Sequence, residues 1–271
     1  PRGVLRIYND LDSNLYNMMY CVREKPVSVI TELKYMQNSR EEFETMLRTL
    51  KDKDFAGKNL AEELELTQIS FPPAQAEEIS AKLMQRAIPP DARRAAMFFL
   101  LHNLSYNGLG TEFAALDRDW DRFEHQITRC ARILQHIPME NRSYKEILGK
   151  YDALDTVFYC DPPYLGAEKY GVPFYRSDHQ ELHDMLATRK SFVIVSYNKK
   201  DEIKELYKDF FIFEVDRPNS MSKKKEDRYE EYIMTNYDPA VFAPQISFFN
   251  NYDNGKKACT LVHAPKYPLK T

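Results

Sequence analysis

The segment TVFYCDPPY, Thr156 to Tyr164, places several reactive and rigid residue types side by side. Its β-branched and aromatic residues predict a buried strand over 156–160, which ends at Asp161. Pro162 and Pro163 follow, and each ring fixes φ and removes a backbone N–H. The carboxylate of Asp161 and the carbonyl of Pro162 are therefore two adjacent acceptors, able to take both hydrogens of one amino group. Tyr164 adds a flat face for stacking on a planar heterocycle.

These groups suit the methylation of an exocyclic amine on a base. The amino nitrogen is a poor nucleophile because its lone pair is delocalised into the ring. Accepting both hydrogens favours a tetrahedral nitrogen whose lone pair can attack a methyl group. Such catalysis works by positioning and electrostatics, without a metal or a covalent intermediate. A strand-ending turn is the alternative interpretation of the tetrapeptide, but the preceding strand and the following aromatic favour a site.

Composition indicates a globular, well-cored protein. The chain has 271 residues, of which 43% are hydrophobic, enough for one large α/β domain or for a core with a smaller insertion. No apolar run reaches the roughly 20 residues that span a bilayer. The four cysteines are scattered, which fits a reducing cytosol and provides no metal framework.

The charge balance predicts no extended nucleic-acid surface. The net charge is −3, so any contact with a polyanion has to be local. The densest basic cluster is SMSKKKEDR, which contains Lys223, Lys224 and Lys225. Taken alone, this cluster is more typical of a solvated loop than of a binding site.

The first half of the chain is predicted to be mainly helical. A short strand over Val4 to Tyr8 precedes a helix with apolar residues at Leu15, Met18, Met19 and Val22. The remaining expected features are several helices between 28 and 85 interrupted at 71–73, a helix from 90 that leads into a turn at 106–108, and a helix over 118–137.

The second half alternates strands with helices, which predicts a largely parallel sheet with helices on its faces. Asp178 is the expected cap of one of these helices. The strands are expected at 156–160, 191–198, 211–217 and 229–237, with helices at 178–187 and 201–210. Residues 240–271 are expected to form a C-terminal extension.

Five blocks of the sequence, in order, resemble the Dam-type (class D12) DNA adenine-N6 methyltransferases, which use S-adenosylmethionine. The block MENRSYKEILGKYDALDTVFYCDPPY ends in the catalytic motif FYCDPPY, and the Asp of this motif is typical of the adenine-specific enzymes. The other blocks are YNDLDSNLYNMMYCVREKP, RRAAMFFLLHNLSYNGLG, FVIVSYN and KKKEDRYEEYIMTNY. The resemblance implies a Rossmann-like α/β methyltransferase core at 1–31 and 139–239, with a mainly helical target-recognition insertion at 32–138.

The resemblance also implies roles for individual residues. Asp161, Pro162, Pro163 and Tyr164 would form the catalytic loop and hold a flipped adenine of double-stranded DNA. The residues expected to bind the methyl donor are Asp10, Ser143, Tyr144 and Asp161, with Asp10 on the ribose hydroxyls. Those expected to bind DNA are Tyr106, Asn107, Lys223, Lys224 and Lys225. At Ser143 the family often has an acid that accepts from the donor's adenine, and a hydroxyl replaces it here.

The glycine-rich loop that follows the family's first strand has no counterpart among the eight glycines. We therefore expect a fragment that begins near the family's second strand and binds the donor weakly. The expected function is site-specific DNA methylation of the restriction-modification or phage type, in the cytoplasm of a bacterial or phage-infected cell. The alternatives are an inactive DNA-binding remnant and an RNA or protein amide methyltransferase. The oligomeric state and recognised sequence are left open.

Two histidines on the expected 178–187 helix have a spacing that zinc sites use. His179 and His183 lie four residues apart. No third ligand is apparent nearby, so we interpret them as a surface pair and expect no metal and no membrane contact.

Overall fold

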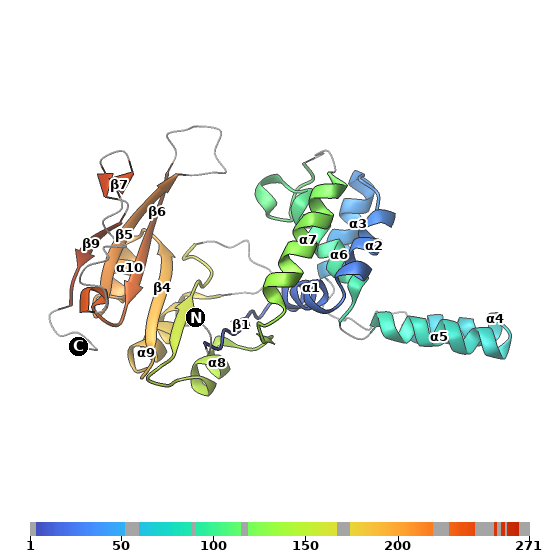
Figure 1. Ribbon diagram of the computed structural model, residues 1–271, viewed down its shortest axis with the longest axis horizontal. Helices are drawn as coiled ribbons and strands as arrows, with labels where there is room; N and C mark the ends of the chain where they lie inside the picture. Colours follow the sequence, from blue (N-terminus) through green and yellow to red (C-terminus); the bar gives the residue numbers. More distant parts are fainter. Residues whose placement is uncertain are drawn as a thin grey trace. The chain divides into compact units, whose positions relative to one another are not determined.

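The computed structural model describes residues 4–51, 60–87, 90–114, 119–166, 174–218, 228–241, 252–253, 256–257 and 259–265 (Figure 1). Its contacts divide the chain into two compact units, Pro1–Arg142 and Ser143–Thr271. The division into core, insertion and extension that the family resemblance implies stays a prediction. None of the described helices has the length and apolar character needed to cross a bilayer.

The first unit is built around a helical core. Helix α6 (Ala92–Asn103) packs against α1 (Ser13–Glu24), α2 (Pro26–Tyr35) and α3 (Arg40–Lys51), while α7 (Trp120–Leu134) packs on α1 and α2. Asp12 and Asp91 cap α1 and α6, because their carboxylates accept from free backbone N–H groups. The centre of this core is fully buried and contains Cys21, Val29, Leu33, Met46, Leu100 and Ile127.

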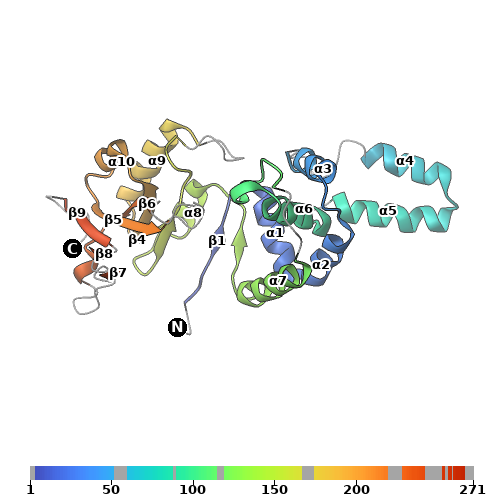
Figure 2. The same ribbon diagram turned by 90° about the horizontal axis from the view of Figure 1, so that it is seen from above.

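Helices α4 (Leu60–Ser70) and α5 (Pro73–Ala87) form an antiparallel hairpin and lie side by side (Figure 2). The predicted interruption is confirmed, since α4 ends before Phe71 and α5 starts at Pro73. Proline is well placed at the start of α5, where its missing N–H has no helical partner to lose.

A short parallel pair closes the first unit. β1 (Tyr8–Asn9) pairs with β2 (Met139–Glu140), and the Asp10 N–H extends the ladder to the Glu140 carbonyl. The predicted strand over Val4 to Tyr8 is therefore displaced toward the C-terminus. The physical reason is that a strand needs a partner, and in the described structure the two residues of β2 lie opposite Tyr8 and Asn9.

The second unit contains a five-stranded sheet of order β3-β4-β6-β5-β9. Its strands are β3 (Val157–Cys160), β4 (Phe192–Asn198), β5 (Phe211–Pro218), β6 (Arg228–Thr235) and β9 (Cys259–His263). The expectation of a largely parallel sheet is wrong here: β3 and β4 pair in parallel, and the other three pairings are antiparallel. The reason is that β6 turns back beside β5 and inserts between β5 and β4. A directly following strand can pair this way because an antiparallel connection needs no helical crossover.

Three helices accompany this sheet, α8 (Tyr144–Lys150), α9 (Arg176–Ala187) and α10 (Asp201–Leu206). In Figure 2, α9 and α10 lie on the same side of it. Leu182, Leu186 and Ile203 from these helices join Val193 and Val195 of β4 in the core. The remaining elements are the short strands β7 (Tyr252–Asp253) and β8 (Lys256–Lys257), and the 3₁₀ helices η1 (Tyr106–Gly108) and η2 (Pro239–Val241).

Helix α9 starts earlier than the sequence predicts. Asp178 is its third residue and not its cap, and the Asp178 carboxylate accepts from the Tyr175 N–H at 2.6 Å. An acid in the first turn that bonds back to the residue before the helix satisfies a free donor and favours the helix dipole. These contacts extend α9 by two residues beyond the predicted start.

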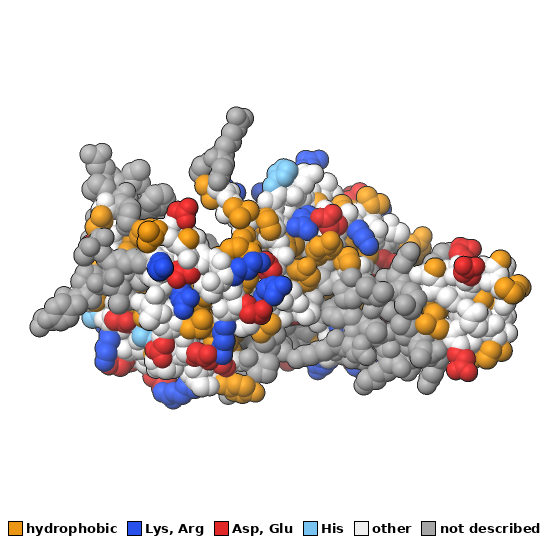
Figure 3. All heavy atoms as spheres, turned by 90° about the horizontal axis from the view of Figure 1, so that it is seen from below, with side chains coloured by type: hydrophobic (Ala, Val, Ile, Leu, Met, Phe, Trp, Pro, Cys, Tyr) orange, Lys and Arg blue, Asp and Glu red, His pale blue; other side chains and the backbone are white. Residues whose placement is uncertain are grey.

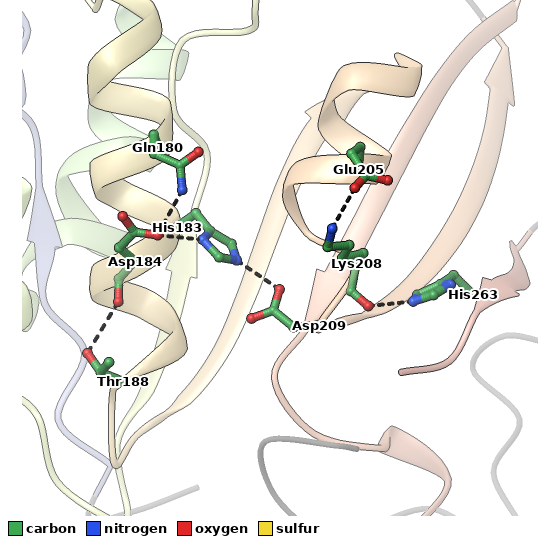
Figure 4. Close-up of polar contacts among 8 residues, drawn as sticks. All are labelled: Gln180, His183, Asp184, Thr188, Glu205, Lys208, Asp209 and His263. Atoms are coloured by element: carbon green, nitrogen blue, oxygen red, sulfur yellow. Dashed lines mark hydrogen bonds and ion pairs between the residues drawn. The ribbon is translucent and has the colours of Figure 1, made fainter. Parts of the chain in front are cut away.

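The interpretation of His179 and His183 as a surface pair is wrong. His179 is 4% exposed, and its Nδ1 lies 2.8 Å from the Tyr197 hydroxyl. His183 bridges two carboxylates, with Nδ1 2.9 Å from Asp184 Oδ1 and Nε2 2.8 Å from Asp209 Oδ1 (Figure 4). Burial lowers the pKa of His183, but the hydrogen bonds to Asp209 and Asp184 outweigh burial and raise it. His183 therefore ties α9 to Asp209, two residues before β5.

This bridge predicts a pH-dependent stability. Because the folded-state pKa of His183 is raised, its contribution is complete below the unfolded value of about 6.5 and is lost as the pH rises through the folded-state pKa. We expect His183→Gln to lower the free energy of unfolding by about 1–2 kcal/mol near pH 6 and by less near pH 9. Urea unfolding followed by circular dichroism at both pH values measures this. His125→Gln, at an exposed histidine of α7, is the control, and an equal loss at both pH values contradicts the bridge.

Candidate functional site

Asp161 directly follows β3, beside the C-terminal part of the parallel strand β4. The register pairs Cys160 with Val195, so Asp161 and Ser196 are the next residues of their two chains. The Ser196 hydroxyl donates to Asp161 Oδ1 at 2.8 Å, and the Tyr159 hydroxyl lies 3.3 Å from Ser196 Oγ. Asp161 is exposed, whereas Ser196 is buried. The structure thus presents an accessible carboxylate with one oxygen already bound.

The loop after Asp161 is held from β4 and the residues that follow it. The Leu165 carbonyl accepts from Lys200 Nζ at 2.7 Å and from Asn198 Nδ2 at 3.4 Å. Gly166 has φ of +81°, a conformation that side-chain-bearing residues rarely adopt, and an added Cβ would lie 2.9 Å from Lys200 Nζ. The proline pair and these contacts together fix the path of the loop.

Tyr164 is anchored through its hydroxyl, which donates to Glu231 Oε1 at 3.1 Å. Its ring lies 6.2 Å from the Tyr197 ring, measured between centroids, with an interplanar angle of 34°. Burial raises the pKa of Tyr197 and lowers the pKa of its neighbour His179. Burial thus favours the neutral form of both groups, and Tyr164 itself remains half-buried.

Ser143 and Tyr144 begin helix α8. Ser143 is the N-cap of a capping box: its hydroxyl accepts from the Lys145 N–H, and the Glu146 carboxylate accepts from the Ser143 N–H. The Tyr144 ring lies 5.9 Å from the Phe174 ring. Burial raises the pKa of Tyr144 to about 12, and its buried hydroxyl has no hydrogen-bond partner among the described residues.

A continuous series of ring contacts joins this helix to the loop from Asp161 to Tyr164. Phe174 contacts His179 at 4.8 Å, and His179 contacts Tyr197 at 5.5 Å, again between ring centroids. Tyr144 and Tyr164, predicted from different motifs, therefore belong to one aromatic cluster of the second unit.

Asp10 belongs to the first unit, where it directly follows β1. Its Oδ1 accepts from the Asp12 N–H at 2.8 Å, and its Oδ2 accepts from the Tyr8 hydroxyl at 3.3 Å. Burial raises the pKa of Asp10, and the hydrogen bonds counteract part of that effect. A carboxylate has about four lone-pair positions, so these two bonds leave capacity for a diol.

The turn at 106–108 is also in the first unit and is closely tied. Ser105 accepts from the Gly110 N–H at 2.7 Å and donates to the His102 carbonyl at 3.0 Å. This fixed turn presents Tyr106 with 58% of its surface exposed. The Asn107 side chain and Lys223, Lys224 and Lys225 lie outside the described residues. On the face shown in Figure 3, basic and acidic side chains are interspersed, in keeping with the net charge.

Over residues 5–221, the chain matches the family described as D12 class N6 adenine-specific DNA methyltransferase. The chain belongs to this family. The match spans most of the chain and contains both Asp10 and the loop from Asp161 to Tyr164. A search of curated proteins found no match. The predicted family is thus confirmed, and it makes the Asp161 loop the main candidate for the acceptor side of a methyltransferase.

Several residues that contact the segment from Asp161 to Leu165 were not predicted. Ser196, Glu231 and Lys200 bind Asp161, Tyr164 and Leu165, yet they lie 35, 67 and 35 residues away in sequence. The available signal was a polar residue at every second position at and just after the end of β4, namely Ser196, Asn198 and Lys200. A polar residue inside an otherwise apolar strand is a candidate for a specific contact.

The capping role of Ser143 can be tested apart from any donor contact. We expect Ser143→Ala to lower the free energy of unfolding by about 1 kcal/mol, since the cap is lost, and Ser143→Asp to change it little, because both residues cap well. Urea unfolding followed by circular dichroism compares the two variants. Equal stability of Ser143→Ala and the parent chain would show that this hydroxyl does not cap α8.

Proposed function

We propose that this methyltransferase transfers a methyl group from S-adenosylmethionine to the exocyclic amino nitrogen of adenine in double-stranded DNA. The observation that supports this most directly is the accessible Asp161 carboxylate directly after β3, with Ser196 of β4 donating to one of its oxygens. The family supports the reaction class. In open α/β sheets, ligands bind beyond the carboxyl ends of the strands, where this carboxylate lies.

On the acceptor side, Asp161 and the Pro162 carbonyl would each accept one hydrogen of the amino group. The nitrogen lone pair would then point away from the base plane, toward the methyl. Once the nitrogen has gained the methyl it must lose one proton, and Asp161 is the acceptor beside it. The Tyr164 ring would stack on the base, which has to leave the duplex because its amino group is otherwise paired.

The described residues fit the donor in two places. S-adenosylmethionine supplies an electrophilic methyl on a sulfonium whose sulfur keeps the bonding electrons. The unsatisfied Tyr144 hydroxyl and the adjacent ring provide a polar atom and a stacking face for a purine. Asp10 would provide the carboxylate for the ribose hydroxyls. The Ser143 hydroxyl would contribute only the hydrogen-bonding capacity that its capping bond leaves unused.

On the DNA side, Tyr106 is the described residue best placed for stacking, because a rigid turn exposes its ring. Asn107 would read a base edge beside it. Lys223, Lys224 and Lys225 would contact phosphates and so supply the positive charge that the chain as a whole lacks.

The decisive experiment follows tritium from the labelled methyl donor into DNA, RNA and protein. We expect label in the amino group of adenine in DNA, and we expect Asp161→Ala to reduce the rate about 100-fold or more, since it removes one of two acceptors in a preorganised site. Tyr164→Phe should keep more activity than Tyr164→Ala because it keeps the stacking ring.

Asp155→Ala is the matched control, because Asp155 is an exposed aspartate just before the other end of β3. Label in RNA or protein but not in DNA would contradict the proposal and favour the amide or RNA alternative. No label in any substrate would favour an inactive DNA-binding remnant. Equal labelling of DNA by the parent chain and Asp161→Ala would remove Asp161 from the mechanism.

The three lysines give a separate prediction. Replacing Lys223, Lys224 and Lys225 by Ala should weaken binding to all DNA sequences alike and reduce the slope of log affinity against log salt by about 1 per lost phosphate contact. Fluorescence anisotropy over a salt series measures this slope. The triple replacement of Lys190, Lys204 and Lys208 by Ala removes the same charge elsewhere in the chain and serves as control. An unchanged slope assigns the cluster to a solvated loop.

A further inference from the structure

Two polar side chains near the end of β4, Ser196 and Asn198, point to one face of the sheet and bind Asp161 and Leu165 of the loop that follows β3. Ser196 and Asn198 alternate with Val195 and Tyr197, which are buried in the core. In a strand, alternate side chains point to opposite faces. The alternation that buries Tyr197 therefore directs Ser196 and Asn198 toward the residues that follow β3.

The hydrogen bonds at Ser196 have a defined direction. An ionised carboxylate only accepts, so the single Ser196 hydrogen is donated to Asp161 Oδ1 at 2.8 Å. The Ser196 oxygen must then accept from the Tyr159 hydroxyl, which lies 3.3 Å away. Tyr159, Ser196 and Asp161 thus form an ordered series of donors that ends on one oxygen of the catalytic carboxylate.

This series matters because Asp161 is exposed. The prolines fix the backbone φ of the loop but leave the side-chain torsions of Asp161 free. Ser196 is 3% exposed and sits on a central strand between β3 and β6, so its oxygen is a fixed point. A bond to Oδ1 selects one orientation of the carboxylate, and among the described residues no hydrogen bond occupies Oδ2.

We propose that Ser196 is a positioning residue that orients Asp161 for methyl transfer, with Tyr159 orienting Ser196 in turn. Lys200 and Asn198 restrain the other end of the same loop, because both side chains donate hydrogen bonds to the Leu165 carbonyl. This inference deepens the proposed function and rests on it for the role of Asp161. The contact between Ser196 and Asp161 is a separate claim that can be tested without turnover.

The first test is structural and compares crystal structures of the full chain, the Ser196→Ala variant and the Ser191→Ala variant. Ser191 is a matched control: it is a fully buried serine next to the opposite end of β4, and its hydroxyl also donates to an aspartate, Asp152. We expect one Asp161 conformer in the parent chain and in Ser191→Ala, and a changed or divided one in Ser196→Ala. An unchanged Asp161 conformer in Ser196→Ala overturns the proposal.

The second test is kinetic and uses methyl transfer to adenine-containing DNA. We expect Ser196→Ala to lower kcat about 10-fold with little change in KM, Tyr159→Phe to lower kcat by less, and Ser196→Thr to recover part of the loss because it restores the hydroxyl. Tyr159 is 64% exposed, so Tyr159→Phe tests the series even where Ser196→Ala folds poorly.

The outcomes separate the two proposals. If the parent chain transfers no methyl to DNA, the proposed function fails, and the Asp161 conformer still decides the positioning claim. If the parent chain is active and both Ser196→Ala and Tyr159→Phe retain its kcat, the positioning claim fails and the proposed function stands. A rise in KM alone would assign Ser196 to substrate binding and would also overturn the claim.

Discussion

The parallel register between β3 and β4 is the constraint on which the candidate site depends. Pairing Cys160 with Val195 brings the carboxyl ends of both strands to one edge and sets Asp161 beside Ser196. A slip of one residue would reverse the face of every side chain on β3. Tyr159 and Asp161 would then turn away from Ser196, and Phe158 would leave the core. Hydrophobic burial therefore fixes the geometry of a polar site.

Beneath this edge, the protein uses two histidines of one helix in opposite ways. His179 is enclosed by rings and bonded to the Tyr197 hydroxyl, and burial lowers its pKa. His183, one turn along, meets two carboxylates that raise its pKa despite burial. His179 belongs to the aromatic cluster that contains Tyr164, whereas His183 faces the turn before β5. Both histidines lie on the same helix, so their surroundings decide the direction in which each pKa moves.

The sequence predicted the local features well, because they depend on neighbours in the chain. The strand before Asp161 and the interruption at Phe71 follow from an apolar run and from prolines. Prediction from the sequence failed where a segment far away in the chain determines the structure. The insertion of β6 between β4 and β5, and the contacts of Ser196 and Glu231 with the loop, require a register between segments far apart. No local pattern contains that information.

The loop from Asp161 to Tyr164 is not rigid through its prolines alone. Pro162 and Pro163 fix two backbone torsions, while the carboxylate of Asp161 and the ring of Tyr164 retain their side-chain rotations. Hydrogen bonds from Ser196 and to Glu231 restrict those rotations, and both partners come from the sheet itself. The tetrapeptide can therefore occur as an ordinary turn in other proteins. The orientation of its carboxylate and ring depends on neighbouring strands that supply a donor for the acid and an acceptor for the tyrosine.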